Sequence, residues 1–116
     1  FFIFFSDDDL CRKIKKKNKH IIQVFESKCI HSHGISKVKN IFEKIYLREH
    51  YYLLDKFYYF HKSDNHKDMM KNIIDKKNNY LIKIFFSLIT VRLKKVVYYF
   101  ARYTAILKFN NFLKKN

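Results

Sequence analysis

The chain contains a single glycine, Gly34, and no proline or tryptophan among its 116 residues. An all-β domain needs a turn every ~8–12 residues, and such turns are usually built with glycine and proline. Because both residue types are almost absent, the chain lacks the turns of a β-sandwich or barrel. The sequence therefore predicts an all-α fold, a small bundle of about four helices with two long antiparallel helices.

Cysteine is also scarce, since only Cys11 and Cys29 are present. Two cysteines cannot form a disulfide framework, although one bridge between them stays open, and a reducing compartment is the default expectation. Cys29 lies close to His31 and His33, which suggests zinc. Structural zinc sites normally pair close ligands with a second distant pair, and only Cys11 is left as a thiolate partner. A plain polar loop is therefore favoured, and no metal or cofactor is expected.

The usual elements of catalysis are missing as well. One glycine cannot build a phosphate-binding loop, and the sequence has no His-Glu-x-x-His motif. The ten carboxylates form no pair on an apolar face, where burial would raise a pKa. Cys29 with His31 could make a nucleophile pair, but adjacent loop residues rarely present that geometry. The chain is therefore not expected to be an enzyme or to have a small-molecule substrate.

Positive charge is what the chain has in excess, with a formal net charge of +15. Such a charge on a small domain is self-repulsive unless an anionic partner offsets it. Nucleic acid is the first candidate partner, an anionic membrane surface the second, and a basic but inert surface the third. The abundant residue types also have AT-rich codons, so part of this composition reports a biased genome.

Residues 1–19 are expected to form a basic N-terminal extension to a helical RNA-binding domain at residues 20–116. The opening segment, Phe1–Phe5, is too short to span a bilayer, which needs ~20 apolar residues. Ser6–Asp9 favours a helix start, because it offers N-cap side chains and negative charge. The basic run at 12–17 is either a solvated arm or an arm that contacts phosphate.

Helical periodicity starts at Val38 and continues to Tyr58, with Ser36 available as a cap. His50 is expected to be partly exposed at a bend in this helix. Upstream, residues 21–25 predict a short amphipathic turn.

The densest apolar run, Tyr80–Val91, is too short for a membrane span. Extending it meets Arg92, Lys94 and Lys95, each of which costs ~2.5–3.5 kcal/mol at mid-bilayer. A buried helix is expected here, and a membrane partner is not. A final helix, carrying Val96 to Leu107, follows.

A polar hinge separates the two long helical stretches. Its residues, His61 to His66, combine two imidazoles, a carboxylate, a hydroxyl, a carboxamide and an ammonium group. Asp64 or Ser63 can cap the helix that follows. Helices cannot enter the deep major groove of A-form RNA, so loops and helix ends meet its minor groove and junctions. The Gly34 loop and this hinge are therefore the expected RNA contacts.

Four short stretches carry a resemblance to a known family: Ile21-Ile22-x-x-Phe25, His33-Gly34-Ile35-Ser36-Lys37-Val38-Lys39, His61-Lys62-Ser63-Asp64-Asn65-His66, and Ala101-Arg102-Tyr103-Thr104-x-Ile106-Leu107. In this order they resemble the bacterial-type ribosomal small-subunit protein fifteen family. The hinge stretch, similar to that family's His-Lys-x-Asp-His-His, is the most specific. The resemblance implies a small all-helical protein that binds a junction in ribosomal RNA.

On this resemblance, Gly34 and Lys39 take the places that contact the three-way junction. The hinge takes the place that meets a second minor-groove surface. Two segments compete for the family's third-helix pattern, Lys76–Lys77 with Tyr80 and Lys94–Lys95 with Tyr98. The candidate RNA-binding residues are His33, Gly34, Lys37, Lys39, His61, Lys62, Ser63, Asp64, His66, Lys76, Lys77, Tyr80, Lys94, Lys95 and Arg102.

The function expected from the resemblance and the charge is structural. The chain would bind and stabilise a ribosomal RNA junction beside neighbouring ribosomal proteins in the small subunit. The mitochondrial matrix is the expected compartment, with a plastid or the cytoplasm also compatible. The alternative is an accessory helical subunit of an organellar membrane or respiratory assembly, contacting protein or lipid rather than RNA.

Overall fold

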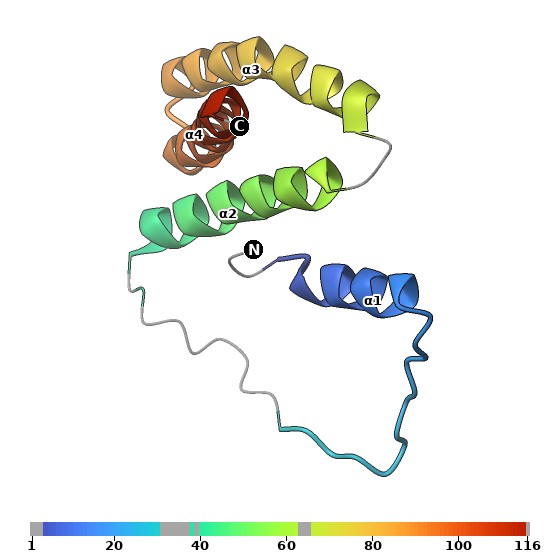
Figure 1. The fold of residues 1–116 in the computed structure, drawn as a ribbon. Helices are drawn as coiled ribbons and strands as arrows, with labels where there is room; N and C mark the ends of the chain where they lie inside the picture. The colour runs from blue at the N-terminus through green and yellow to red at the C-terminus, as the bar shows by residue number, and fades with distance from the viewer. Residues whose placement is uncertain (1–3, 31–37, 39, 63–65, 116) are drawn as a thin grey trace.

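The computed structural model describes residues 4–30, 38, 40–62 and 66–115, with the backbone alone for residues 66–74. This part of the chain contains four helices and no strand, which confirms the predicted all-α class. The helices are α1 (Ser6–Lys16), α2 (Ile41–His61), α3 (His66–Ile89) and α4 (Leu93–Lys115). In Figure 1, α2 and α3 run in opposite directions, α4 packs against both, and α1 lies along α2.

The hydrophobic core lies where α4 meets α2 and α3. Phe57 of α2 and Phe109 of α4 are each only 1% exposed, with ring centroids 5.1 Å apart. Burying an aromatic side chain of this size stabilises the fold by roughly 1.5–3 kcal/mol. The other members of the core cluster are Leu53, Leu54, Tyr80, Ala105 and Ile106.

The chain's only two alanines let α4 approach its neighbours closely. Ala101 and Ala105 are four residues apart, so they lie on one helix face, and both are completely buried. A larger side chain at either position would overpack the contact, which typically costs about 1–3 kcal/mol. These two positions therefore fix how near α4 sits to the rest of the bundle.

An ion pair between a buried carboxylate and a partly buried guanidinium lies in the contact between α2 and α4. The Glu49 carboxylate accepts hydrogen bonds at Oε2 from Arg102 Nε (3.0 Å) and Nη2 (2.8 Å). The Arg102 guanidinium also lies over the Tyr98 ring, 4.3 Å from its centroid. Because an unpaired buried charge is costly, this pair favours one register of α2 against α4.

His50 is buried, so the predicted partial exposure is wrong: α4 covers the place where a bend was expected. Thr104 Oγ1 donates to the Ala101 carbonyl (2.9 Å) and lies 2.9 Å from His50 Nδ1. The hydroxyl therefore accepts from His50 Nδ1–H, and the Ala101 carbonyl lies 3.3 Å from the same nitrogen. Burial lowers the pKa of His50, because it disfavours the charged form.

The long helix begins later than the periodicity suggested. Asn40 is its N-cap, and the Asn40 side chain accepts from Phe42 N–H (2.9 Å), so the cap is not Ser36, which lies outside the described residues. The amphipathic turn predicted at residues 21–25 is also wrong, because it buries nothing: Phe25 is 87% exposed. No neighbouring helix lies close enough to cover that segment (Figure 1).

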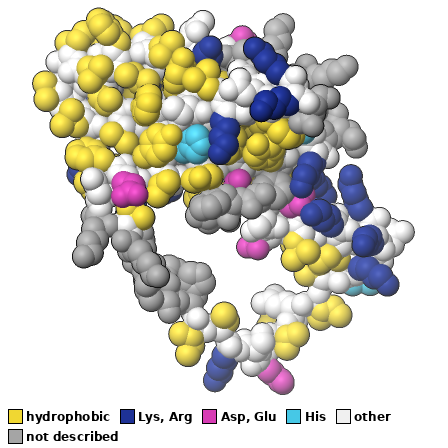
Figure 2. All heavy atoms as spheres, turned by 60° about the vertical axis from the view of Figure 1, so that its left-hand side comes forward, with side chains coloured by type: hydrophobic (Ala, Val, Ile, Leu, Met, Phe, Trp, Pro, Cys, Tyr) yellow, Lys and Arg dark blue, Asp and Glu magenta, His cyan; other side chains and the backbone are white. Residues whose placement is uncertain are grey.

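The apolar run at 80–91 is not the buried helix that was expected. Within it only Tyr80 and Ser87 are buried, where α3 faces α4. The opposite side of α3 is also apolar and stays exposed, and Figure 2 shows hydrophobic side chains gathered over this end of the bundle. A one-sided contact with α4 cannot cover a helix that is apolar on two sides. Within the described residues, none of the helices is long and apolar enough to cross a membrane.

The turn from α3 to α4 carries backbone strain at Val91. Its φ is 53°, in the left-handed region, and the following Arg92 N–H donates to the Ser87 carbonyl (2.8 Å). Glycine or asparagine normally occupies this position at a helix end. For a residue with a Cβ the conformation costs roughly 1–2 kcal/mol, and valine is branched at that atom.

Relieving this strain tests the turn. We expect Val91→Asn to raise the free energy of unfolding by about 1 kcal/mol, because asparagine tolerates the left-handed region. Val91→Thr is the matched control, since it adds polarity and keeps the β-branch. Urea denaturation measures both variants. An equal effect of the two would show that polarity, not backbone strain, governs this position.

The buried His50 gives the fold an acid sensitivity. Its folded pKa is below the ordinary value of 6.5, so its contribution to stability is complete above that pH. The contribution is lost as pH falls below about 6.5 through the lowered folded pKa. We expect urea midpoints to decline over this window, and His50→Gln, which keeps an N–H for Thr104, to flatten the decline. A wild-type slope unchanged in the variant would contradict the assignment.

Candidate nucleic-acid interface

The segment before α1 is held against α2 by a buried carboxylate. Phe4 N–H donates to Asp55 Oδ2 (3.0 Å), and Asp55 is 1% exposed. The Phe4 ring packs edge-on against Tyr52, and the Phe5 ring stacks on Tyr59, with centroids 5.3 and 5.5 Å apart. These contacts place the start of α1 beside the C-terminal half of α2.

Helix α1 begins at Ser6, as the sequence predicted, but without the expected side-chain cap. The residue before it, Phe5, occupies the N-cap position with φ 61° and makes no capping hydrogen bond. Asp7, Asp8 and Asp9 lie in the first turn, where negative charge favours the helix dipole. The basic residues fall in the last turn, which the dipole also favours.

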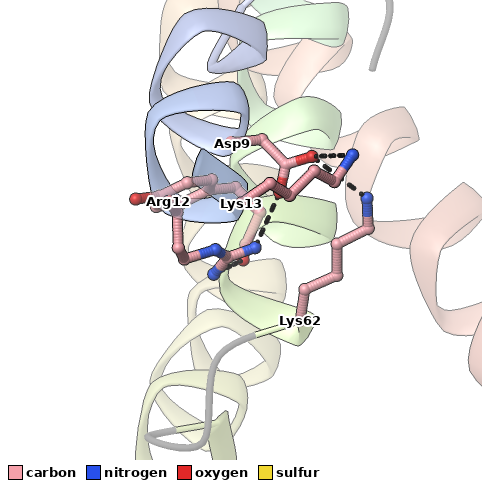
Figure 3. Close-up of polar contacts among 5 residues, drawn as sticks. Asp9, Arg12, Lys13 and Lys62 are labelled. Atoms are coloured by element: carbon pink, nitrogen blue, oxygen red, sulfur yellow. Dashed lines mark hydrogen bonds and ion pairs between the residues drawn. The ribbon is translucent and has the colours of Figure 1, made fainter. Parts of the chain in front are cut away.

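Asp9 is the centre of the contact between α1 and α2. Its carboxylate is 3% exposed and pairs with Arg12 Nη2 (2.8 Å), Lys13 Nζ (2.8 Å) and, from the end of α2, Lys62 Nζ (3.5 Å). Figure 3 shows the three cations converging on this carboxylate. Arg12 also donates to the Tyr59 carbonyl (3.3 Å) and lies over the Tyr59 ring, 4.6 Å from its centroid.

These cations hold the pKa of Asp9 at about 2, below the ordinary 3.8. The hydrogen bond from Lys13 is the largest cause, and the hydrogen bond from Arg12 and the charge of Lys62 act in the same direction. Burial opposes them. Asp9 is therefore ionised at neutral pH and binds α1 to the end of α2.

A basic concavity results from this docking. It has a volume of about 560 Å³ and is lined by Asp8, Cys11, Arg12, Lys15, Lys16 and Tyr59. The ammonium groups of Lys15 and Lys16 can contact phosphate, and the Asp8 carboxylate can accept a hydrogen bond from a ribose hydroxyl. The Tyr59 ring forms a wall of the concavity and does not offer a free face, because Arg12 and Phe5 pack on it.

The basic run of α1 is thereby brought beside Lys62, at the end of α2 where the polar hinge begins. His61 is half-buried, edge-on to Phe109 and Phe112 of α4, and Lys62 is exposed beside Asp9. Ser63 and Asp64 lie outside the described residues, as does the side chain of His66. The predicted contact loop, with His33, Gly34, Lys37 and Lys39, also lies outside them.

The two competing third-helix segments lie elsewhere. Lys76 is exposed, Lys77 has its ammonium 6.0 Å from the Tyr103 ring centroid, and Tyr80 is buried in the core. A buried Tyr80 has no face for a base to stack on. Lys94 and Lys95 are exposed at the start of α4, on the same side of Figure 1 as the start of α2 and away from α1.

Arg102 differs from the other predicted RNA-binding residues. Its side chain is 23% exposed, and its guanidinium is engaged by Glu49 and Tyr98. The structure gives it a role in packing α4 on α2, and an RNA contact stays a prediction.

The sequence analysis did not select Asp9 as part of a site or connect it with Lys62, although Lys62 was a candidate RNA-binding residue and the basic run at 12–17 a possible phosphate contact. The spacing of Asp9 to Arg12 and Lys13, three and four residues, could have indicated the pairs within α1. The contact with Lys62 joins residues far apart in the chain, so no local pattern reveals it. Cys11 and Cys29 are both free and exposed. Among the described residues, no three histidine, cysteine or acidic side chains are grouped to hold a metal ion.

Comparison with protein-family models, with curated proteins and with solved structures finds no match to this chain. The resemblance to the ribosomal family therefore stays a prediction. The interface is defined by the geometry and charge of the chain itself.

Removing the Asp9 charge tests the docking of α1. We expect Asp9→Asn to weaken it by about 1.5–3 kcal/mol, because three cations lose their charged acceptor. Asp8→Asn is the matched control, with the same charge change on the exposed side of the same helix. Amide signals of α1 by NMR are the readout. Equal effects of the two variants would mean that net charge, not the buried cluster, matters.

The same cluster predicts how acid acts on α1. Because the folded pKa of Asp9 is depressed, its contribution is complete above about pH 4 and is lost as pH falls through about 2. We expect the α1 amide signals to change over this window in the wild type. They should already be changed in Asp9→Asn at neutral pH.

Proposed function

We propose that the protein binds structured RNA, as a scaffold component of the small ribosomal subunit in mitochondria. The observation that carries this proposal is the docking of the basic run of α1 on the end of α2, where a concave, cationic surface lies next to the Asp9–Lys62 pair. The role is to hold RNA geometry, not to catalyse a reaction.

The distribution of charge supports an anionic partner of this kind. Asp9 and Glu49 are buried and already engage five cations: Arg12, Lys13, Lys62, Arg48 and Arg102. The eight other carboxylates face twenty other lysines and arginines, in a chain whose formal charge is +15. Binding phosphate would relieve that repulsion and release counterions.

The shape of the surface favours structured RNA over duplex DNA. A helix reading DNA lies in the major groove, whereas here the basic face of the short helix α1 lines the concavity and α2 walls it with Tyr59. Lysines that contact phosphate, with a carboxylate available to ribose hydroxyls, suit a minor groove or a junction. The resemblance of the hinge to the ribosomal family's motif agrees with this reading.

Salt dependence of RNA binding tests the proposal. The probe is a three-way-junction RNA, titrated over a series of salt concentrations. We expect log affinity to fall steeply against log salt for the wild type. Lys15→Ala with Lys16→Ala should reduce that slope by roughly 1 per lysine removed.

The matched control is Lys44→Ala with Arg48→Ala, which removes the same charge from exposed side chains near the start of α2, at the opposite side of the molecule from α1 (Figure 1). Helix α2 has 21 residues and so extends ~30 Å, which separates Lys44 from the hinge. We expect the control to bind like the wild type. Salt-insensitive binding, or equal losses in both double variants, would contradict the proposed interface.

A further inference from the structure

The outward side of α3 exposes a large apolar surface near its C-terminus. Phe85 and Ile89 are each 62% exposed, and they are four residues apart on one helix face. The exposed apolar residues of these turns, here called the α3 apolar face, are Leu81, Ile82, Phe85, Phe86, Leu88 and Ile89. Figure 2 shows hydrophobic side chains covering this end of the molecule. Contiguous exposed apolar side chains of this size mark an interaction surface.

A cationic concavity adjoins this face at the turn to α4. It has a volume of about 220 Å³ and is lined by Lys83, Phe86, Ser87, Thr90, Arg92, Lys95 and Tyr99. The set contains three cations and no carboxylate, which suits a phosphate group. Phe86 belongs to both the concavity and the α3 apolar face, so the two are continuous.

Two further features of this turn fit a partner that is both apolar and anionic. Val91 is 75% exposed and strained, and it puts an apolar side chain at the tip where glycine or asparagine is usual. Helix α4 then carries Lys94 and Lys95 in its first turn, which has no acidic residue. The helix dipole disfavours cations there, and a bound anion would offset that cost.

We propose that the α3–α4 end docks on the surface of an anionic phospholipid bilayer. The α3 apolar face enters the boundary between headgroups and acyl chains, and the Lys83–Arg92–Lys95 concavity holds a lipid phosphate. An apolar face bordered by cations is the combination that binds such surfaces. The same cations would repel a second copy of this strongly basic chain, and the face is the convex side of a helix rather than a groove for a peptide.

The sequence alone disfavoured a membrane partner because Arg92, Lys94 and Lys95 exclude a span. The same residues favour docking on a membrane surface, since their long side chains can reach the headgroups while apolar neighbours enter the bilayer. This inference does not depend on the proposed function, because the surface lies away from the α1 concavity (Figure 1).

Vesicle flotation of the full chain tests the proposal. The probes are phosphatidylcholine vesicles with and without phosphatidylserine. We expect the protein to float with the phosphatidylserine vesicles and not with the neutral ones. Phe85→Ser with Ile89→Ser should lower the partition coefficient by about tenfold or more, because two large apolar side chains no longer leave water. Both positions are exposed, so the fold should be retained.

A second variant, Lys83→Ala with Arg92→Ala and Lys95→Ala, tests the contribution of the cations to vesicle binding. We expect a loss on the order of a hundredfold, since each cation near an anionic surface contributes ~1 kcal/mol. The matched control, Lys15→Ala with Lys16→Ala and Lys17→Ala, removes three charges from α1 and should cost far less. A further control, Ile22→Ser with Phe25→Ser, removes exposed apolar groups elsewhere and should bind like the wild type.

Several outcomes would overturn the proposal. Equal losses from the two triple-charge variants would indicate adsorption by net charge alone. Unchanged flotation of Phe85→Ser with Ile89→Ser would show that the α3 apolar face stays out of the bilayer. A concentration-dependent dimer abolished by that same pair would assign the face to a second copy. A loss of junction-RNA affinity in the Lys83, Arg92 and Lys95 variant as large as that of Lys15→Ala with Lys16→Ala would make the turn an RNA surface.

Discussion

Burial of a few carboxylates in a strongly cationic chain is the constraint on which this structure depends. With a formal charge of +15, every element carries lysines that repel those of its neighbours. Asp9, Glu49 and Asp55 are each buried at a junction between segments, and each accepts hydrogen bonds from the segment packed against it. Removing one partner of a buried pair leaves an uncompensated charge, so these contacts favour one arrangement of α1, α2 and α4.

Sequence patterns predicted the helices more reliably than they predicted which side chains are buried. Scarcity of glycine and proline and apolar spacings of three and four were enough to predict an all-helical fold with a long helix on each side of residues 61–66, and the structure has these helices at 41–61 and 66–89. Burial was predicted less well. His50 was predicted to be partly exposed because the residue that covers it, Thr104, lies on α4, far away in the sequence. The 80–91 run was predicted to be buried because no local pattern indicates that α4 covers only one side of it.

The two ends of the molecule differ in the chemistry they present. At one end, α1 and Tyr59 of α2 line a cationic concavity that also contains a carboxylate, Asp8. At the other, the α3–α4 turn combines cations with large exposed apolar side chains. The candidate RNA residues of the sequence reading were spread over both ends. The Asp9 cluster, formed by residues more than fifty positions apart, could be identified only from the fold.

Cysteine footprinting tests most directly that the Asp9-organised concavity is where RNA binds. Cys11 lines that concavity and is exposed, so alkylation reports its access to solvent. In a Cys29→Ser background, with Lys44→Cys as the distant reference thiol, saturating junction RNA should slow alkylation of Cys11 and leave the reference unchanged. If Cys11 reacts equally fast with and without bound RNA, the concavity is not the binding surface.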